Sequence, residues 1–229
     1  MKEKIKWGLK AGSAVIVFLI SDILLSEIYA FLLMNLDMEE HLIRTFYQTG
    51  SDLITLLAAF PIFILVMRIW GKLPRFHLKG TASLTHRNYL IYAVLAIIPM
   101  LFLAVIEIVL IRHGQITQED IISFTPGNMM YTLMFSCVLL PIMEEIMFRG
   151  ILLHKLLPLG TRYAILMTTC YFVIIHYNNP VNMLLALTTG LVLTHMAVKT
   201  KGILPTIIFH IGINLLGQVV LPLCIRLPH

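Results

Sequence analysis

Residues 141–150 read PIMEEIMFRG and place three charged side chains in an otherwise apolar run. Glu144 and Glu145 are adjacent, and Arg149 follows four residues after the second glutamate. No other Asp, Glu, Lys or Arg occurs between residues 129 and 148. Ionisable groups are costly inside an apolar membrane helix, so this stretch marks a candidate functional site.

The composition of the whole chain predicts a polytopic membrane protein. Of its 229 residues, 59% are hydrophobic and 13% are charged, and the mean hydropathy is +0.89. Soluble domains contain about 45–50% apolar and about 25% charged residues. We therefore expect an all-α fold, a transmembrane helical bundle that forms a single membrane domain, residues 1–229, in the cell membrane.

Apolar stretches that end at turn or charge signals predict about seven spans. Each is long enough to cross roughly 30 Å of hydrocarbon, and the fifth is close to the minimum. Residues 1–127 would contain three N-terminal spans, and residues 128–229 would contain four more. The expected spans lie at about 9–34, 52–70, 89–111, 128–157, 161–177, 181–198 and 203–221.

The positions of the basic residues predict the orientation of the chain. With a cytoplasmic N-terminus, 14 of the 17 Lys and Arg fall in the predicted inner segments, which are 1–10, 68–88, 149–162 and 199–202. This asymmetry is the one that the positive-inside rule expects. It also accounts for the excess of 17 basic over 12 acidic residues, so we expect membrane lipids and no nucleic acid as partners.

The two glutamates are predicted to have different roles. Glu145 and Arg149 are at positions i and i+4, so they can pair on one face of a helix. Glu144 is rotated by about 100° and has no partner on its own helix. Pro141 removes an N–H and is expected to free the carbonyl of Cys137, with a kink beside Glu144. We expect Glu145 to be held ionised and Glu144 to be free to exchange a proton.

Two further pairs at i and i+4 spacing lie on later spans. Phe172 and His176 are on the fifth, and His210 and Asn214 are on the seventh. Taken alone, each histidine is more often a packed or interhelical residue than a catalytic one. A small-residue stripe, Ala-x-x-x-Gly at 186–190, predicts a close helix contact and no chemistry.

Depth estimates bring these residues to similar levels. At 1.5 Å per residue, Glu144 lies about 20 Å and His176 about 21 Å from the inner ends of their helices. His210 and Asn214 lie about 12 and about 18 Å from the start of theirs. The estimate requires the fourth span to continue past Arg149 to about residue 157.

Two kinds of hydrolytic chemistry suit this set. A glutamate and a histidine can jointly deprotonate water, while another histidine and an asparagine donate hydrogen bonds to an oxyanion. Alternatively, Glu144, His176 and His210 could hold a divalent metal such as zinc. The HExxH, Gly-x-Ser-x-Gly and Gly-x-Gly-Asp motifs are all absent from the sequence.

The three motifs, EExxxR at 144–149, FxxxH at 172–176 and HxxxN at 210–214, resemble those of the CPBP family of intramembrane proteases. That family includes the CAAX prenyl endopeptidase and the bacterial Abi proteins. The resemblance covers about residues 141–221. It implies that the last four spans form a catalytic core, in which Glu144 and His176 activate water.

The resemblance also implies that His210 and Asn214 stabilise the oxyanion, with Glu145, Arg149 and Phe172 as supporting residues. The expected activity is an intramembrane endopeptidase that hydrolyses a peptide or lipidated protein substrate. Bacterial members of the family are also linked to bacteriocin immunity. Two alternatives remain open: a non-enzymatic immunity or sensor-binding membrane protein, and a proton-coupled transporter.

Overall fold

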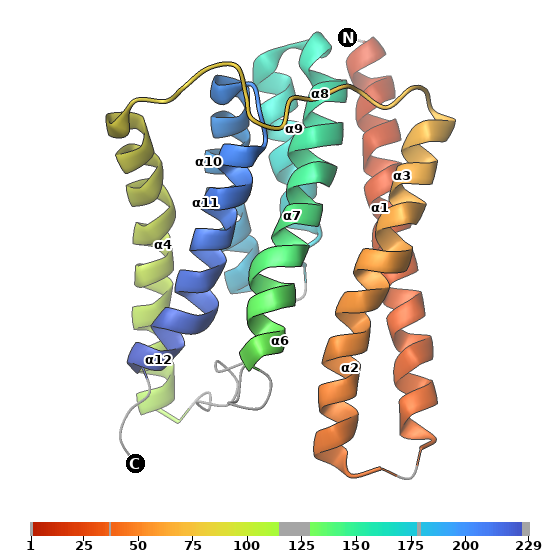
Figure 1. Ribbon diagram of the computed structural model, residues 1–229, viewed down its shortest axis with the longest axis vertical. Coiled ribbons are helices and arrows are strands. Elements are labelled where there is room, and N and C mark those ends of the chain that lie inside the picture. Colours follow the sequence, from red (N-terminus) through yellow and green to blue (C-terminus); the bar gives the residue numbers. More distant parts are fainter. Residues whose placement is uncertain (1, 37, 115–128, 178–179, 226–229) are drawn as a thin grey trace.

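The computed structural model describes residues 2–36, 38–114, 129–177 and 180–225, and this part of the chain is a bundle of helices (Figure 1). No strand occurs in these residues, which confirms the all-α prediction. Seven helical runs are present within them. The predicted start of the fourth span at residue 128 lies outside the described residues.

The seven runs are built from α-helices with inserted π and 3-10 turns. The first three are α1 (Lys2–Met34), then α2 (Glu40–Ile54), η1 (Thr55–Ala59) and α3 (Phe60–Ile69), then α4 (His86–Arg112). The fourth comprises α6 (Met129–Met134), η2 (Phe135–Leu139), α7 (Leu140–Glu145), η3 (Ile146–Leu152), α8 (Leu153–Leu156) and η4 (Leu157–Leu159). The last three are α9 (Thr161–Ile174), α10 (Pro180–Thr200), and α11 (Leu204–Leu215) with η5 (Leu216–Val220) and α12 (Leu221–Ile225).

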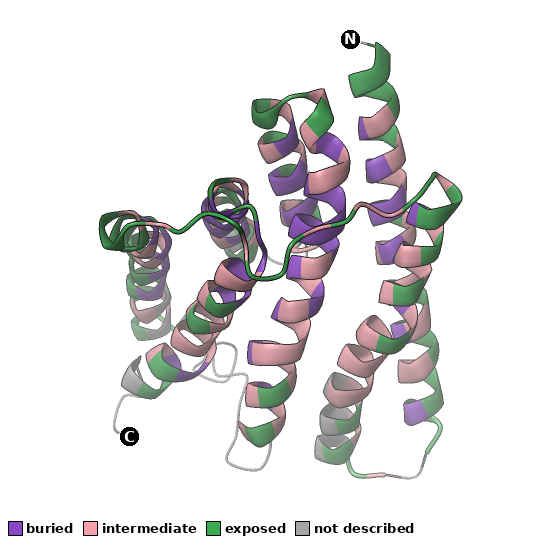
Figure 2. Ribbon diagram, turned by 45° about the horizontal axis from the view of Figure 1, so that its top comes forward, coloured by how far each residue is buried: buried purple, intermediate pink, exposed green. Residues whose placement is uncertain are grey.

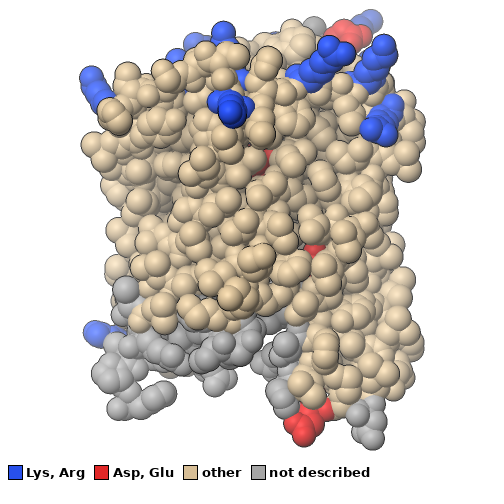
Figure 3. Space-filling model, in the orientation of Figure 1, with Lys and Arg blue, Asp and Glu red and all other residues tan. Residues whose placement is uncertain are grey.

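In the part of the chain that the structure describes, five helices are long and apolar enough to cross a membrane, namely Lys2–Met34, Thr49–Ile69, His86–Leu110, Asn182–Thr200 and Leu204–Leu223. Helix α9 has only 14 residues, about 21 Å of helix, which is less than a hydrocarbon core. The count of seven spans and the cytoplasmic N-terminus therefore stay predictions. Figure 3 shows most of the visible Lys and Arg side chains at the end of the molecule where the chain begins.

The fourth helical run continues without interruption from residue 129 to residue 159. It passes Arg149 and reaches residue 157, so the continuity that the depth estimate required is confirmed. Pro141 does not break this run, because a π turn, η2, precedes it. The turns η1 and η5 likewise end two residues before Pro61 and Pro222. A wider turn accommodates a residue that lacks an N–H.

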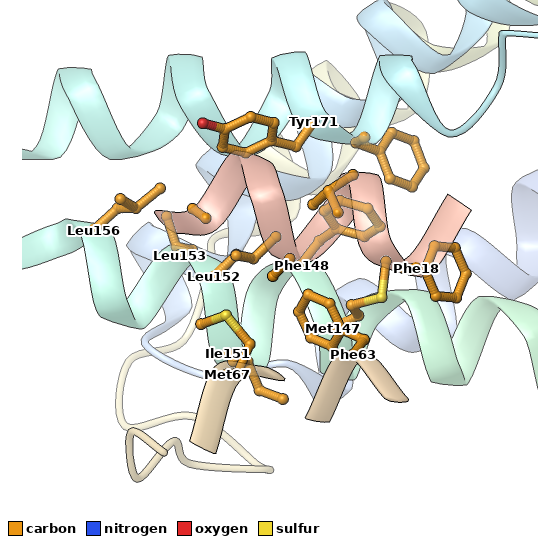
Figure 4. Packing of buried hydrophobic residues seen from close by; sticks show 14 of the residues in the cluster. Phe18, Phe63, Met67, Met147, Phe148, Ile151, Leu152, Leu153, Leu156 and Tyr171 are labelled. Atoms are coloured by element: carbon orange, nitrogen blue, oxygen red, sulfur yellow. The ribbon is translucent and has the colours of Figure 1, made fainter. Parts of the chain in front are cut away.

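The largest apolar core surrounds the second half of the fourth run, where η3 and α8 pack between α1, α3 and α9 (Figure 4). Phe148 and Leu152 of η3 are completely buried, as is Phe63 of α3. Figure 2 shows the same concentration of buried residues toward the end that holds the N-terminus. Burying side chains of this size contributes about 1.5–3 kcal/mol each. This core therefore fixes the helix that carries the two glutamates.

The connection between α3 and α4 crosses the end of the bundle and ties α11 in place (Figure 1). The backbone N–H of Ile203 donates to His77 O at 3.2 Å, and that of Leu204 donates to Leu78 O at 2.8 Å. These bonds satisfy N–H groups at the start of α11, which have no intrahelical partner. They fix the height at which α11, the helix with His210, begins.

Candidate active site

A fully buried ion pair lies at the centre of the site. Arg149 Nη1 donates to Glu145 Oε1 at 2.6 Å, and neither side chain is exposed. Arg149 Nη2 donates to the carbonyl of Gly190 at 3.3 Å, and the guanidinium stands 4.4 Å from the ring centroid of Phe172. The structure thus places Glu145 and Arg149 in the pairing that their spacing predicted. Three separate helical runs meet at the guanidinium.

The ring of His210 is positioned between the two adjacent glutamates. Its Nδ1 is 2.9 Å from Glu145 Oε1, and its Nε2 is 3.7 Å from Glu144 Oε2. Because a carboxylate that is paired with Arg149 can only accept, Nδ1 must carry the hydrogen of that bond. His210 is buried, whereas the side chain of Glu144 is 16% exposed. Glu144 is therefore the carboxylate that a small molecule such as water can reach.

His176 and His210 both contact the ring of Phe172. The ring centroids lie 4.7 Å apart for His176 and 5.8 Å apart for His210. Helix α9 ends at Ile174, so His176 sits in the turn that follows and is partly buried. The α-helix thus ends three residues before residue 177, the predicted end of the fifth span.

The backbone fixes the tautomer of His176. Its Nδ1 lies 2.8 Å from the carbonyl oxygen of Phe172, and a carbonyl can only accept a hydrogen bond. Nδ1 therefore carries the hydrogen, and in the neutral imidazole Nε2 is left with its lone pair. That nitrogen can accept a proton or a hydrogen bond from water.

Asn214 binds a backbone carbonyl that Pro141 leaves without a donor. In the π turn η2, the N–H of Leu140 donates to Phe135 O, five residues earlier. In the same register the carbonyl of Ser136 would pair with residue 141, which has no N–H. Asn214 Nδ2 donates to Ser136 O at 3.0 Å instead. The carbonyl that receives this side-chain bond is therefore that of Ser136, one residue before the predicted Cys137.

The structure brings most of the predicted residues into one network, but not all of them into direct contact. Glu144, Glu145 and Arg149 connect to His210, and Phe172 links this group to His176 through ring contacts. Asn214 lies one turn along α11 from His210 and donates from its amide to Ser136 O of η2. Among the residues that the structure describes, no hydrogen bond or ion pair joins His176 to Glu144.

Sequence reasoning missed two residues that complete the site. Ser136 could not be recognised, because only its carbonyl is used and the π turn is invisible in the sequence. The sequence predicted that Gly190 lies at a close helix contact, but it did not predict that the carbonyl of Gly190 accepts a hydrogen bond from Arg149. A Cβ on Gly190 would lie 3.0 Å from Cδ1 of Phe172 and 3.3 Å from Cγ2 of Thr169. The missing side chain is what lets the Phe172 ring lie against α10.

The residues do not fit a metal centre in this arrangement. Among the described residues, no group of three or more His, Cys, Asp or Glu side chains is placed to hold a metal ion. The possible zinc set of Glu144, His176 and His210 is therefore not assembled here. We assign no chemical step to a metal.

Comparison with known families gives one match. Residues 126–216 match the family model described as type II CAAX prenyl endopeptidase, Rce1-like. The matched segment contains all seven candidate residues and confirms the resemblance that the three motifs predicted. No curated protein and no solved structure matched the chain.

Proposed function

We propose that this chain, whose residues 126–216 match the Rce1-like endopeptidase family, is an intramembrane endopeptidase that hydrolyses a peptide bond with an activated water. The observation that carries the proposal is the position of His210 between Glu144 and Glu145. It combines an accessible carboxylate with an oriented imidazole. These groups suit general acid–base chemistry on an amide.

Charge balance supports Glu144 as the base. Glu145 and Arg149 neutralise each other, so the remaining charges are those of Glu144 and His210. A net charge is costly in an apolar interior. A protonated His210 beside an ionised Glu144 makes the group of four neutral. His210 then donates from Nδ1 to Glu145 and holds a second proton on Nε2, on the side of Glu144.

In the first step, Glu144 takes a proton from water while the water oxygen attacks the carbonyl carbon of the substrate. The Nε2 lone pair of His176 accepts a hydrogen bond from the second O–H of that water and orients it, and this hydrogen stays on the water oxygen. This division of roles follows from exposure and tautomer, since Glu144 is partly exposed and His176 Nδ1 is occupied by a backbone carbonyl.

The developing oxyanion requires hydrogen-bond donors that are already in place. His210 Nε2–H is one donor, and Glu145 holds the ring in its orientation. Asn214 has two N–H groups, of which one is bound to Ser136 O, so the other is the second donor. The C–N bond then breaks as Glu144 returns its proton to the leaving nitrogen, which yields a carboxylic acid and an amine.

The substrate class follows from the location of the site. Five helices suit a membrane, and Glu144 lies near the middle of a helical run of 31 residues, 129–159. We propose a peptide or lipidated protein that reaches the site within the cell membrane, with the N-terminus of the enzyme on the cytoplasmic side. Most visible Lys and Arg side chains lie at that end (Figure 3), which supports this orientation.

The test compares newly formed peptide termini in membranes that contain different forms of the chain. We expect the wild type and the surface control Glu3→Gln to produce the same cleaved termini, and His210→Ala to produce none. Thermal unfolding in detergent establishes whether each variant is folded. Cleavage by His210→Ala at the wild-type level would contradict the proposal.

A further inference from the structure

Two lysines from separate helices converge on one indole ring, away from the catalytic residues. Lys10 Nζ of α1 lies 4.9 Å from the ring centroid of Trp7, and Lys155 Nζ of α8 lies 5.1 Å from the same centroid. Cation–π contacts stabilise each ammonium group. The two positive charges repel each other, however, and both side chains are partly buried.

Neither lysine has an acidic partner. In the described part of the chain, no ion pair joins Lys10 or Lys155 to a carboxylate, whereas the neighbouring Lys6 pairs with Glu3 at 3.8 Å. Partly buried cations without a counter-charge are unfavourable. The cluster therefore has the charge to hold an anion that the described residues do not supply.

The cluster is held rigidly. Tyr163 Oη of α9 donates to Lys4 O, and Tyr171 Oη donates to Gly8 O, both at 2.6 Å. A Cβ on Gly8 would lie 2.5 Å from Tyr163 Oη, so glycine is required for this approach of the two helices. Trp7 packs on the same apolar core as α8. The backbone of α1 beside Trp7 and Lys10 is thus held in place before any ligand binds, which lowers the cost of binding.

The surroundings identify the anion as part of a lipid. Beyond Lys10, α1 continues as one of the helices suited to cross a membrane, and its side chains Ile20 and Leu24 are 50% and 57% exposed. Trp favours the boundary between hydrocarbon and water, where its ring is apolar and its N–H is hydrated. An anion at this boundary that also has an apolar body is a phospholipid.

We propose that Trp7, Lys10 and Lys155 form a binding site for the phosphodiester group of an anionic phospholipid, whose acyl chains run along α1 toward Ile20 and Leu24. Basic side chains at a membrane surface each contribute measurably to attraction of anionic lipids. Here the two charges are arranged around one ring, so the site binds one lipid rather than a diffuse layer. This inference does not depend on the peptidase activity.

The experiment is native mass spectrometry of the full chain, released from micelles that contain equal amounts of phosphatidylglycerol and phosphatidylcholine. We expect retained phosphatidylglycerol on the wild type and at least about tenfold weaker retention on Lys10→Gln/Lys155→Gln. The control Lys79→Gln/Lys201→Gln removes two exposed charges near the turn between α10 and α11 and is expected to bind as the wild type does.

Thermal unfolding without added lipid checks that the double variant folds, and its unfolding temperature should be close to that of the wild type, because the substitutions remove a repulsion together with two cation–π contacts. Equal retention of phosphatidylcholine would show that the charge is not recognised and would overturn the proposal. So would unchanged binding by Lys10→Gln/Lys155→Gln. Displacement of the lipid by excess inorganic phosphate would show a simple anion site and would also overturn it.

Discussion

Arg149 and Glu145 form an ion pair of 2.6 Å between two side chains that are both completely buried. The same guanidinium binds the carbonyl of Gly190 and stands over the ring of Phe172. The same carboxylate binds His210. One pair therefore sets the relative positions of the fourth helical run, α9, α10 and α11 around the site.

Removing Arg149 alone should destabilise the protein strongly, because it leaves the carboxylate of Glu145 buried without its partner. We expect Arg149→Met to lower the free energy of unfolding by about 3–5 kcal/mol. The double variant Glu145→Gln/Arg149→Met should lose less, since no uncompensated charge remains. Chemical unfolding in detergent measures both. This explanation would be contradicted if the double variant lost as much unfolding free energy as the single variants Arg149→Met and Glu145→Gln lose together.

Gly190→Ala should lower activity through Phe172. Its methyl group would lie 3.0 Å from Cδ1 of Phe172, so the ring that contacts Arg149 and His210 must shift. We expect the cleavage rate to fall about tenfold, as for other small displacements of positioning residues. Gly212→Ala is the matched control on α11, because its Cβ would meet nothing within 4 Å.

A smaller side chain at position 172 tests the same contact from the other side. The double variant Gly190→Ala/Phe172→Leu should lose less activity than the two single fold-losses multiplied together, since the shorter side chain leaves room for the methyl group. Strictly multiplicative losses would show that Gly190 does not act through Phe172.

Asn214→Ala should lower kcat about 100-fold and leave KM nearly unchanged. The amide is assigned to the oxyanion, which exists only along the reaction path. Stability should also fall by about 1–3 kcal/mol, because Ser136 O loses its donor. Steady-state kinetics with a cleaved peptide separates the two parameters. A change in KM alone would place Asn214 in substrate binding and remove it from the oxyanion site.

Treatment with a chelator should leave activity unchanged. The described residues contain no group of three or more His, Cys, Asp or Glu side chains placed to hold a metal ion, and each proposed step uses side chains only. The measurement is the cleavage rate before and after chelation and dialysis. Loss of activity that zinc restores would contradict the proposed mechanism.

The local features of the site could be predicted because they depend on one helix at a time. The pairing of Glu145 with Arg149 follows from i, i+4 spacing, and the continuation of the helix past Arg149 follows from the lack of a breaker before Pro158. The end of α9 near His176 follows from the turn residues behind it. Each of these was confirmed.

The contact of His210 with both glutamates could not be predicted, because it depends on how two helices are offset. The depth estimates separate Glu144 and His210 by about 8 Å, yet Nε2 lies 3.7 Å from Oε2. Figure 1 shows the reason: the α8–α9 hairpin extends beyond the turn between α10 and α11, so the helices do not begin at one level. Helix length alone carries no information on this offset.

The partner of Asn214 could not be predicted for a different reason. A normal α-helix would leave the carbonyl four residues before Pro141 without a donor, which is that of Cys137. The π turn η2 moves the register by one residue, so Ser136 O receives the amide. Nothing in the sequence of 135–139 distinguishes a π turn from an α turn.

The most direct test of the account is the cleavage rate of purified Glu144→Gln relative to wild type, measured on protein whose unfolding temperature is also known. Glu144 is partly exposed and is not part of the Arg149 pair, so its replacement should leave the unfolding temperature close to the wild-type value. We predict that cleavage falls by at least about 1,000-fold, because the base that deprotonates water is lost. A folded Glu144→Gln protein that cleaves at the wild-type rate would contradict the central claim.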